Sequence, residues 1–414
     1  MVLPSPQNRY DTAILLHSLY IKFYPFLYKP PLKLVPHSKE RTVRVVSVKR
    51  PIQAVLPIVF LGTNGLICSL GILCIARGKT FAHVATDIRI WAWATMSCVT
   101  GFGSIGYFLC FVAGLDKMVT FPNEIIRLEG HLEKELRSQR ISKTTTDTLT
   151  GLILEFCIWS CYLFTPFVAL FCEVIGLDAM PVILEFLQSA GFLSMPKGFL
   201  PLIAIHSGQV FLLCITLYET ERILFLAVVI AITWGKLIMS IINKLDEIVG
   251  RNLASIRGGM RDHFNYYNRL IILFDLVEME LKTTITLAIT GFCVAIVSMT
   301  FISVKFHKIY PWFMTVFYAF TTLIMLWVGS VCLGIAGMFD ENCAGLLGQF
   351  KREGLLLGMR GQERKLYLAE VKSLKRIGFL VGHGGVKFGE LSKSSAAGVM
   401  GYVVDETIAM LLAF

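Results

Sequence analysis

The feature that most constrains the fold is a series of long apolar stretches. Each covers about 20 residues, the length that an α-helix needs to cross the hydrocarbon core of a bilayer. The chain is 55% hydrophobic and only 16% charged, whereas ordinary soluble domains are about 25% charged. We therefore expect an all-α, polytopic membrane protein with seven transmembrane helices, at residues 54–76, 90–115, 150–175, 218–242, 281–304, 312–337 and 396–414.

One segment leaves the number of crossings open. Residues 201–218 and 223–242 are both apolar, and the charged run Glu219-Thr220-Glu221-Arg222 separates them. If both crossed, the basic loop at 243–269 would lie outside the cell. Because cytoplasmic loops carry an excess of Lys and Arg, we expect one crossing at 218–242. The stretch before it is expected to be an outer loop element packed on the protein.

The cations predict the orientation of the chain. Nine, six, five and ten Lys or Arg residues fall in 1–50, 116–148, 243–269 and 338–393. These segments alternate with the spans so that all four lie on one side, which the positive-inside rule assigns to the cytoplasm. We expect a cytoplasmic N-terminus, an extracellular C-terminus and a multi-pass protein of the plasma membrane. The net charge of +10 is thereby explained without a nucleic acid partner.

The last apolar segment contains two adjacent carboxylates, Asp405 and Glu406. A charged side chain in lipid is costly, so ionisable residues in membrane helices face protein or a water-filled cavity. Symmetry-related copies of this helix around a water-filled axis would cover its polar side. A ring of Asp405 or Glu406 would then draw cations to the pore. This pattern favours a transport or channel function.

Other function classes have less support. Residues 101–106 fit GxGxxG, but they lie in an apolar helix, so close helix packing is a better interpretation than dinucleotide binding. His206 and His307 lie near the predicted outer face without partners at ligand spacing. We expect no enzymatic activity, no cofactor and no metal site. A G-protein-coupled-type seven-helix receptor and an orphan membrane transporter remain as alternatives, although no Asp/Glu-Arg-Tyr motif follows the third span.

The end of the chain carries a recognisable pattern. It reads Gly385-Val386-Lys387-Phe388, then Leu391-Ser392, Ala397, Val399, Gly401 and Val403-Val404. With the basic N-terminus, the seven spans and the long basic loop before the last span, this pattern resembles the insect (arthropod) chemoreceptor superfamily, the gustatory and odorant receptors. The family closes with Thr-Tyr, five apolar residues and Gln-Phe. Read without gaps from Gly385, Asp405-Glu406 occupy the Thr-Tyr places and Leu412 the Gln place. Read back from Phe414, Glu406-Thr407 and Ala413 occupy them, so in either register the Tyr and Gln are absent.

The resemblance implies a tetrameric, ligand-gated, non-selective cation channel, homomeric or heteromeric. Its partners would be membrane lipid, permeant monovalent or divalent cations, and a small organic tastant or odorant, with a gustatory ligand favoured. The implied division is a cytoplasmic N-terminal segment at 1–50, a six-helix ligand-binding bundle at 51–337, a cytoplasmic anchor region at 338–395 and a pore-lining seventh helix at 396–414.

The candidate sites follow from this division. Carried over by position, the pore would be lined by Asp405, Glu406, Ala409, Met410, Leu412 and Ala413. A pocket for a small organic ligand would have aromatic and Met walls in the outer half of the helices. Residues of these types at that depth are Trp91, Trp93, Phe164, Phe167, Tyr218, Phe225, Met299, Phe301, Trp312, Phe313 and Phe317. The same types form aromatic belts at membrane interfaces, so belt and pocket remain alternatives for each.

Overall fold

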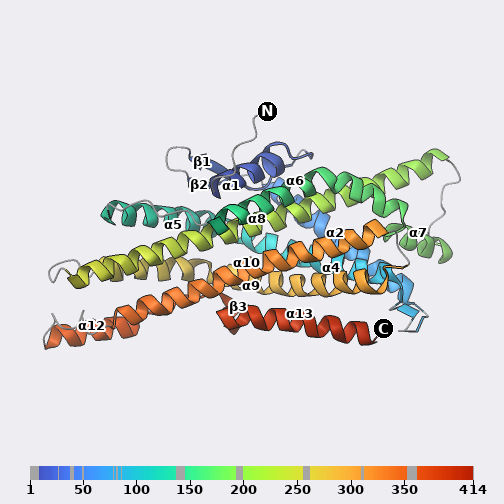
Figure 1. Cartoon of the computed structure of the whole chain (residues 1–414). Coiled ribbons are helices and arrows are strands. Elements are labelled where there is room, and N and C mark those ends of the chain that lie inside the picture. Colours follow the sequence, from blue (N-terminus) through green and yellow to red (C-terminus); the bar gives the residue numbers. More distant parts are fainter. Residues whose placement is uncertain are drawn as a thin grey trace.

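The structure is a computed structural model of one elongated bundle of long helices (Figure 1). It describes residues 9–26, 28–37, 42–48, 51–77, 79–80, 83–84, 86–136, 145–192, 199–254, 262–308, 312–351 and 361–413. Within these residues, seven helices are long and apolar enough to cross a membrane. The expected all-α fold with seven candidate spans is thus confirmed, while the orientation of the termini stays a prediction. Phe414, the end of the last predicted span, lies outside the described residues.

The chain enters the bundle through a short N-terminal segment. Helix α1 and a π-helical turn, η1, precede a two-stranded antiparallel hairpin, β1–β2, in which Leu32 pairs with Ser47. The bounds are α1 Arg9–His17, η1 Ser18–Lys22, β1 Leu32–His37 and β2 Thr42–Ser47. Leu16 and Tyr20 of this segment are buried against the bundle. The segment is therefore part of the core.

The bundle itself is built from long helices joined by short connections. Its elements are α2 Pro51–Ala76, α4 Ile88–Tyr107, η2 Phe108–Ala113, α5 Leu115–Leu136, α6 Thr145–Val174, α7 Met180–Ser189, α8 Phe199–Ala254, α9 Asp262–Lys305 and α10 Trp312–Gln349. After α10 come α12 Gln362–Ser373, the hairpin strands β3 Leu380–His383 and β4 Val386–Glu390, and the closing helix α13 Lys393–Ala413.

Helix α8 corrects the expectation for residues 201–242. The structure has one continuous helix of 56 residues, about 84 Å long at 1.5 Å per residue. The stretch before Glu219 is therefore the first part of this helix and no separate loop element. The charged run does not end the helix because Glu219 and Arg222 are buried and paired with each other inside the bundle.

Helices α9 and α10 are longer than predicted, with 44 and 38 residues. Their extra turns lie at one end of the bundle, together with α5, α12 and the last turns of α8 (Figure 1, left). Phe339 of α10 packs there against Phe274 of α9, and Phe350, just after α10, packs against Tyr267 of α9. Described helices of three of the four basic segments predicted to share one side of the membrane, 116–148, 243–269 and 338–393, thus gather at one end of the bundle, while the N-terminal segment lies nearer its middle.

Close helix packing comes from glycines that the motif search did not single out. A Cβ on Gly65 of α2 would lie 3.2 Å from Thr100 Oγ1, and one on Gly71 would lie 3.0 Å from the Trp93 ring. A Cβ on Gly101, by contrast, would meet nothing within 4 Å. Helices α2 and α4 therefore approach most closely through the α2 glycines. The 101–106 motif packs through its other members, since Ser104 Oγ donates to the Ile58 carbonyl of α2 at 3.3 Å and a Cβ on Gly106 would lie 3.7 Å from Thr284 of α9.

The β3–β4 hairpin connects the bundle to the closing helix. Thr286 Oγ1 of α9 bonds both the backbone nitrogen (2.8 Å) and the backbone oxygen (2.9 Å) of Gly382 in β3. A Cβ at Gly382 would lie 2.2 Å from the Val386 carbonyl, so only glycine fits this approach. The hairpin leads directly into α13, which lies along α9 and α10 with its end near the C-terminus label in Figure 1.

Candidate functional site

The closing helix α13 has one buried face and one exposed face. Val403 and Thr407 are buried, and Val403 packs against Cys293, Ile296 and Val297 of α9. In the most apolar window of α13 only 11% of the residues are buried, against 50% in α8. Most of this helix is therefore left uncovered by its own chain.

The exposed face combines small residues with one carboxylate. Because an α-helix turns by about 100° per residue, Gly401 and Asp405 lie about 200° from Val403. Leu412, which is 82% exposed, points the same way. A Cβ on Gly401 would meet nothing within 4 Å. Glu406 lies about 60° from Val403 by the same geometry, so it stands at the flank of the buried face.

Neither carboxylate of this pair has a partner in the described part of the chain. Asp405 and Glu406 are both exposed and take part in no hydrogen bond or ion pair there. Ala409 and Ala413 are exposed as well, whereas Met410 is half-buried and packs toward α9. Of the six predicted pore residues, five thus lie on the uncovered surface of α13 and one lies against the bundle.

Two of the predicted ligand-pocket residues form one aromatic wall. The rings of Trp91 in α4 and Phe301 in α9 lie 4.9 Å apart, and Phe301 also contacts Phe306 at 5.9 Å. Leu177, from the connection between α6 and α7, packs in the same cluster. Met410 packs against it too, so this cluster, named here the ligand wall, touches the closing helix.

The other predicted pocket residues do not gather at the ligand wall. Trp93 is buried on the α2 side of α4, where its Nε1–H donates to the Leu177 carbonyl at 2.7 Å. Tyr218 and Phe225 belong to the core around the N-terminal segment. Met299 is half-buried in α9, while Phe164, Phe167, Trp312 and Phe317 are exposed. The side chain of Phe313 lies outside the described residues.

A polar cluster that the sequence did not predict lies in the middle of α8. Arg222 donates to Glu219 at 2.6 Å, and its guanidinium lies 4.4 Å from the Tyr24 ring centre. The hydroxyls of Tyr24 and Tyr28 both donate to Glu219. We name these four residues the N-terminal anchor cluster. The signal for this cluster in the sequence is the charged run that interrupts an apolar stretch. Its pairing could not be predicted, because Tyr24 and Tyr28 lie about 190 residues upstream.

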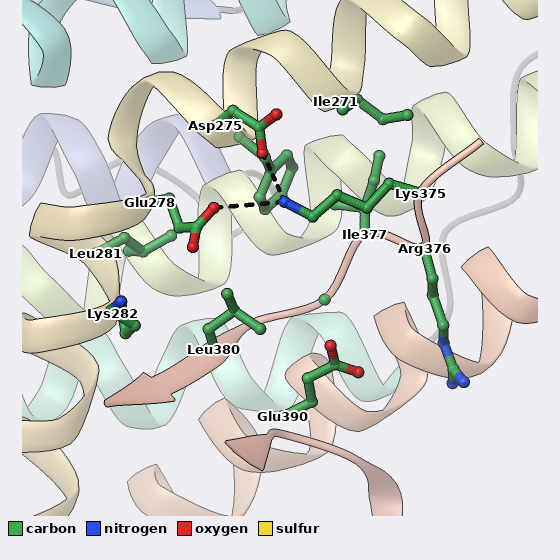
Figure 2. Close-up of a pocket in the computed structure, with 12 residues that line it drawn as sticks. Ile271, Asp275, Glu278, Leu281, Lys282, Lys375, Arg376, Ile377, Leu380 and Glu390 are labelled. Carbon is green, nitrogen blue, oxygen red and sulfur yellow. Dashed lines mark hydrogen bonds and ion pairs between the residues drawn. The ribbon is translucent and has the colours of Figure 1, made fainter. Parts of the chain in front are cut away.

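A second polar feature is a small cleft of about 40 Å³ between α9 and the segment joining α12 to β3 (Figure 2). Lys375 crosses it and bonds Asp275 at 2.9 Å and Glu278 at 3.4 Å. The hydrogen bond to Asp275 raises the pKa of Lys375 above its usual value. The charged lining of this cleft is better suited to holding α9 and the hairpin together than to binding an organic ligand.

Comparisons with known proteins place the fold. No protein-family model matches the chain, and no curated protein matches it. Among solved structures, the insect olfactory receptor OR5 from Machilis hrabei in complex with eugenol is similar over 98% of both chains, with a TM-score of 0.57 and 12% identity. A second structure of the olfactory receptor OR5 from Machilis hrabei is similar over 97% of both chains, with a TM-score of 0.54 and 14% identity. The chain therefore has the seven-helix fold of insect olfactory receptors, as its resemblance to arthropod chemoreceptors implied.

Proposed function

We propose that the chain is a chemosensory receptor subunit that forms a ligand-gated, non-selective cation channel in the plasma membrane. The observation that carries this proposal is the uncovered face of α13, where Gly401, Asp405 and Leu412 point away from the bundle. A carboxylate on such a face is stable in a membrane only where water or protein meets it. The fold, shared with an olfactory receptor, agrees with this function.

Four copies of α13 around a common axis would cover this face with neighbouring subunits and a water-filled pore. Each subunit would turn the side opposite Val403 toward the axis, since that side is bare and Val403 faces α9. Asp405 then contributes to a ring of carboxylates that attracts cations, while Leu412 narrows the pore near its outer end. Glu406, at the flank, faces the boundary with the neighbouring subunit. The assignment of Met410 to the pore is not retained, because its side chain packs toward α9.

The ligand wall supplies a route from binding to opening. Trp91 and Phe301 form an apolar, ring-to-ring contact of the kind that lines small-molecule sites, and the solved receptor with this fold is in complex with eugenol. Met410 packs against the same cluster. A ligand that wedges between the two rings would thus press on the closing helix directly. We propose a small aromatic or aliphatic tastant or odorant as this ligand.

Current recording tests the proposal. Cells that express the chain are challenged with a panel of small organic compounds under voltage clamp, and a ligand-evoked cation current is expected. Asp405→Asn should lower the current carried by cations by about tenfold, because focused charge raises local counter-ion concentration by that order. Glu406→Gln should have a smaller effect. Glu185→Gln, on the exposed side of α7, is the matched control.

Two results would reject the channel. Ligand-evoked G-protein signalling without current would favour the coupled-receptor class, and uptake without macroscopic current would favour a transporter. The oligomeric state of the purified full-length chain in mild detergent gives a separate test. A particle without fourfold symmetry would remove the shared pore.

A further inference from the structure

Three titratable side chains meet where α6 ends, at the end of the bundle opposite the basic segments. Glu173 closes α6, Asp178 lies in the connection to α7, and His206 comes from the first turns of α8. His206 Nδ1 lies 2.5 Å from Glu173 Oε1. These residues lie up to 33 positions apart in the sequence, so their proximity could not be predicted from helical spacing.

The two carboxyl groups require a proton between them. They lie within hydrogen-bonding reach of each other, and one oxygen of each, Glu173 Oε2 and Asp178 Oδ2, is buried with no other partner in the described residues. Two carboxyl oxygens can share a hydrogen bond only if one of them carries the proton. Like charges at this separation also disfavour double ionisation, so such pairs hold one proton.

Within the part of the chain that the structure describes, the neighbouring groups do not supply another cation. The titratable groups that interact with the pair are His206 from α8, the Cys68 thiol from α2 and the Cys172 thiol from α6. The connection to α7 contributes the backbone N–H of Met180, which donates to Asp178 Oδ1 at 3.3 Å. Among the described residues that contact the pair, the His206 ring is the one group that can carry a positive charge.

The same connection supports the ligand wall. Leu177, adjacent to Asp178, accepts the Trp93 Nε1–H and packs with Phe301. We propose that Glu173, Asp178 and His206 form a proton-binding site that couples external acid to the ligand wall. The coupling to ligand rests on the proposed receptor function, whereas proton binding does not. A proton taken up by the carboxyl pair removes the repulsion between Glu173 and Asp178, and the His206 contact holds Glu173 in place beside it.

The direction of the pH effect follows from the carboxyl pair. Burial, and then the neighbouring Glu173, raise the pKa of Asp178 from 3.8 to about 6. A raised pKa means that the folded chain holds the proton more tightly than the unfolded chain. The stability that the proton provides is complete below a pH of about 4 and is lost as the pH rises through about 6.

Thermal unfolding of the full chain in lipid nanodiscs tests proton binding without any ligand. The melting temperature of the wild-type chain should fall as the pH rises from about 5 to about 7.5, the range in which the pair loses its proton. In Asp178→Asn the amide donates to Glu173 in place of the shared proton, so this fall should be largely lost. Glu173→Gln offers the same replacement from the other side. Glu185→Gln, exposed on α7, should keep the wild-type slope.

A wild-type slope retained in both Asp178→Asn and Glu173→Gln would overturn the proton site. Infrared difference spectra across the same pH range give a second readout, the carbonyl stretch of a protonated carboxyl group. That band should disappear with rising pH in the wild-type chain and be absent from the Asp178→Asn difference spectrum. Its persistence in the variant would also overturn the assignment.

Dose–response curves at two pH values test the coupling. Ligand-evoked currents of the wild-type chain should need about fivefold less ligand at the acidic value, a shift typical of coupled sites. The shift should be lost in Asp178→Asn. An unchanged wild-type curve would overturn the coupling. No current in any variant, with the pH-dependent melting intact, would support the proton site and count against the channel instead.

Discussion

Two sets of carboxylates interrupt apolar helices of this chain, and their surroundings are opposite. In α8, Glu219 is fully buried and takes hydrogen bonds from Arg222, Tyr24 and Tyr28. Glu221 beside it takes hydrogen bonds from Thr165 at 2.6 Å and Tyr20 at 3.1 Å. In α13, Asp405 and Glu406 are exposed and have no partner in the described residues.

The difference separates charges that stabilise the fold of the subunit from charges that have no partner within it and can interact with water, ions or another subunit. A buried ion is tolerated only when paired and hydrogen-bonded, and the Glu219 carboxylate meets this condition with partners from two segments. The Arg222 guanidinium is paired with Glu219 through one nitrogen and lies over the Tyr24 ring. The α13 pair gains nothing from its own subunit. A carboxylate that contributes nothing within the subunit agrees with a role in an assembly or a pore, as proposed above.

The largest effect is expected from breaking the buried pair. Arg222→Met leaves the Glu219 carboxylate buried and uncompensated, which should cost about 3–5 kcal/mol of unfolding free energy. The double variant Glu219→Gln with Arg222→Met should regain much of this, because the amide is neutral and its oxygen still accepts from Tyr24. Chemical or thermal unfolding of the purified chain measures both.

The control is an exposed pair with the same spacing. Lys387 and Glu390 are also three residues apart, with side chains 49% and 34% exposed. Lys387→Met should therefore cost no more than about 1 kcal/mol. A double variant that is no more stable than Arg222→Met alone would show that the buried pair is not mutually compensating.

A smaller loss is expected where a neutral donor is removed from the same cluster. Tyr24→Phe removes one hydrogen bond to Glu219 and leaves the ring contact with Arg222 in place. Removing one partner of a buried hydrogen bond should cost about 1–3 kcal/mol. Tyr402→Phe, on the exposed surface of α13, is the matched control and should leave the melting temperature unchanged. Equal melting temperatures for both variants would contradict the anchor role of Tyr24.

The two regions also mark how far the sequence could be interpreted. Hydrophobic length and the positions of Lys and Arg predicted seven spans because both act locally along the chain. The run at 219–222 was interpreted as a break because the partners that stabilise it, Tyr24 and Tyr28, lie far upstream. The sequence shows no partner for His206 at ligand spacing for the same reason, since Glu173 meets it only after α6 and α8 pack. A single sequence does not show which side chains far apart in the chain will pair.

The candidate sites were predicted unevenly for a related reason. Aromatic type and depth selected Trp91 and Phe301, which do meet, but they equally selected Phe164 and Phe167, which are exposed. Depth alone does not say which way a helix face turns. On α13, the helix period fixes the angle between Asp405 and Met410, but only the packing of Val403 against α9 shows which of the two faces the bundle.

A modest gain is expected at the exposed face of α13. Gly401→Ala adds a Cβ that meets no atom of its own chain within 4 Å. Alanine in a helix interior is favoured over glycine by about 0.5–1 kcal/mol, so the isolated subunit should become more stable. The added methyl group also projects toward the axis that four copies would share, which narrows the pore, so channel current should fall. A stability gain with unchanged current would place Gly401 away from the subunit contact.

The smallest effect on the subunit is expected at the α13 carboxylates themselves. Asp405→Asn alters an exposed group without partners, so the unfolding free energy of the detergent-solubilised subunit should change by no more than about 0.5 kcal/mol. Glu221→Gln makes the corresponding change in α8 at a carboxylate that Thr165 and Tyr20 contact, and its effect should be clearly larger. Unfolding of both variants in parallel makes the comparison direct. A loss at Asp405 as large as that at Glu221 would mean that α13 uses this charge within its own subunit, and the carboxylate would then no longer be available to a pore.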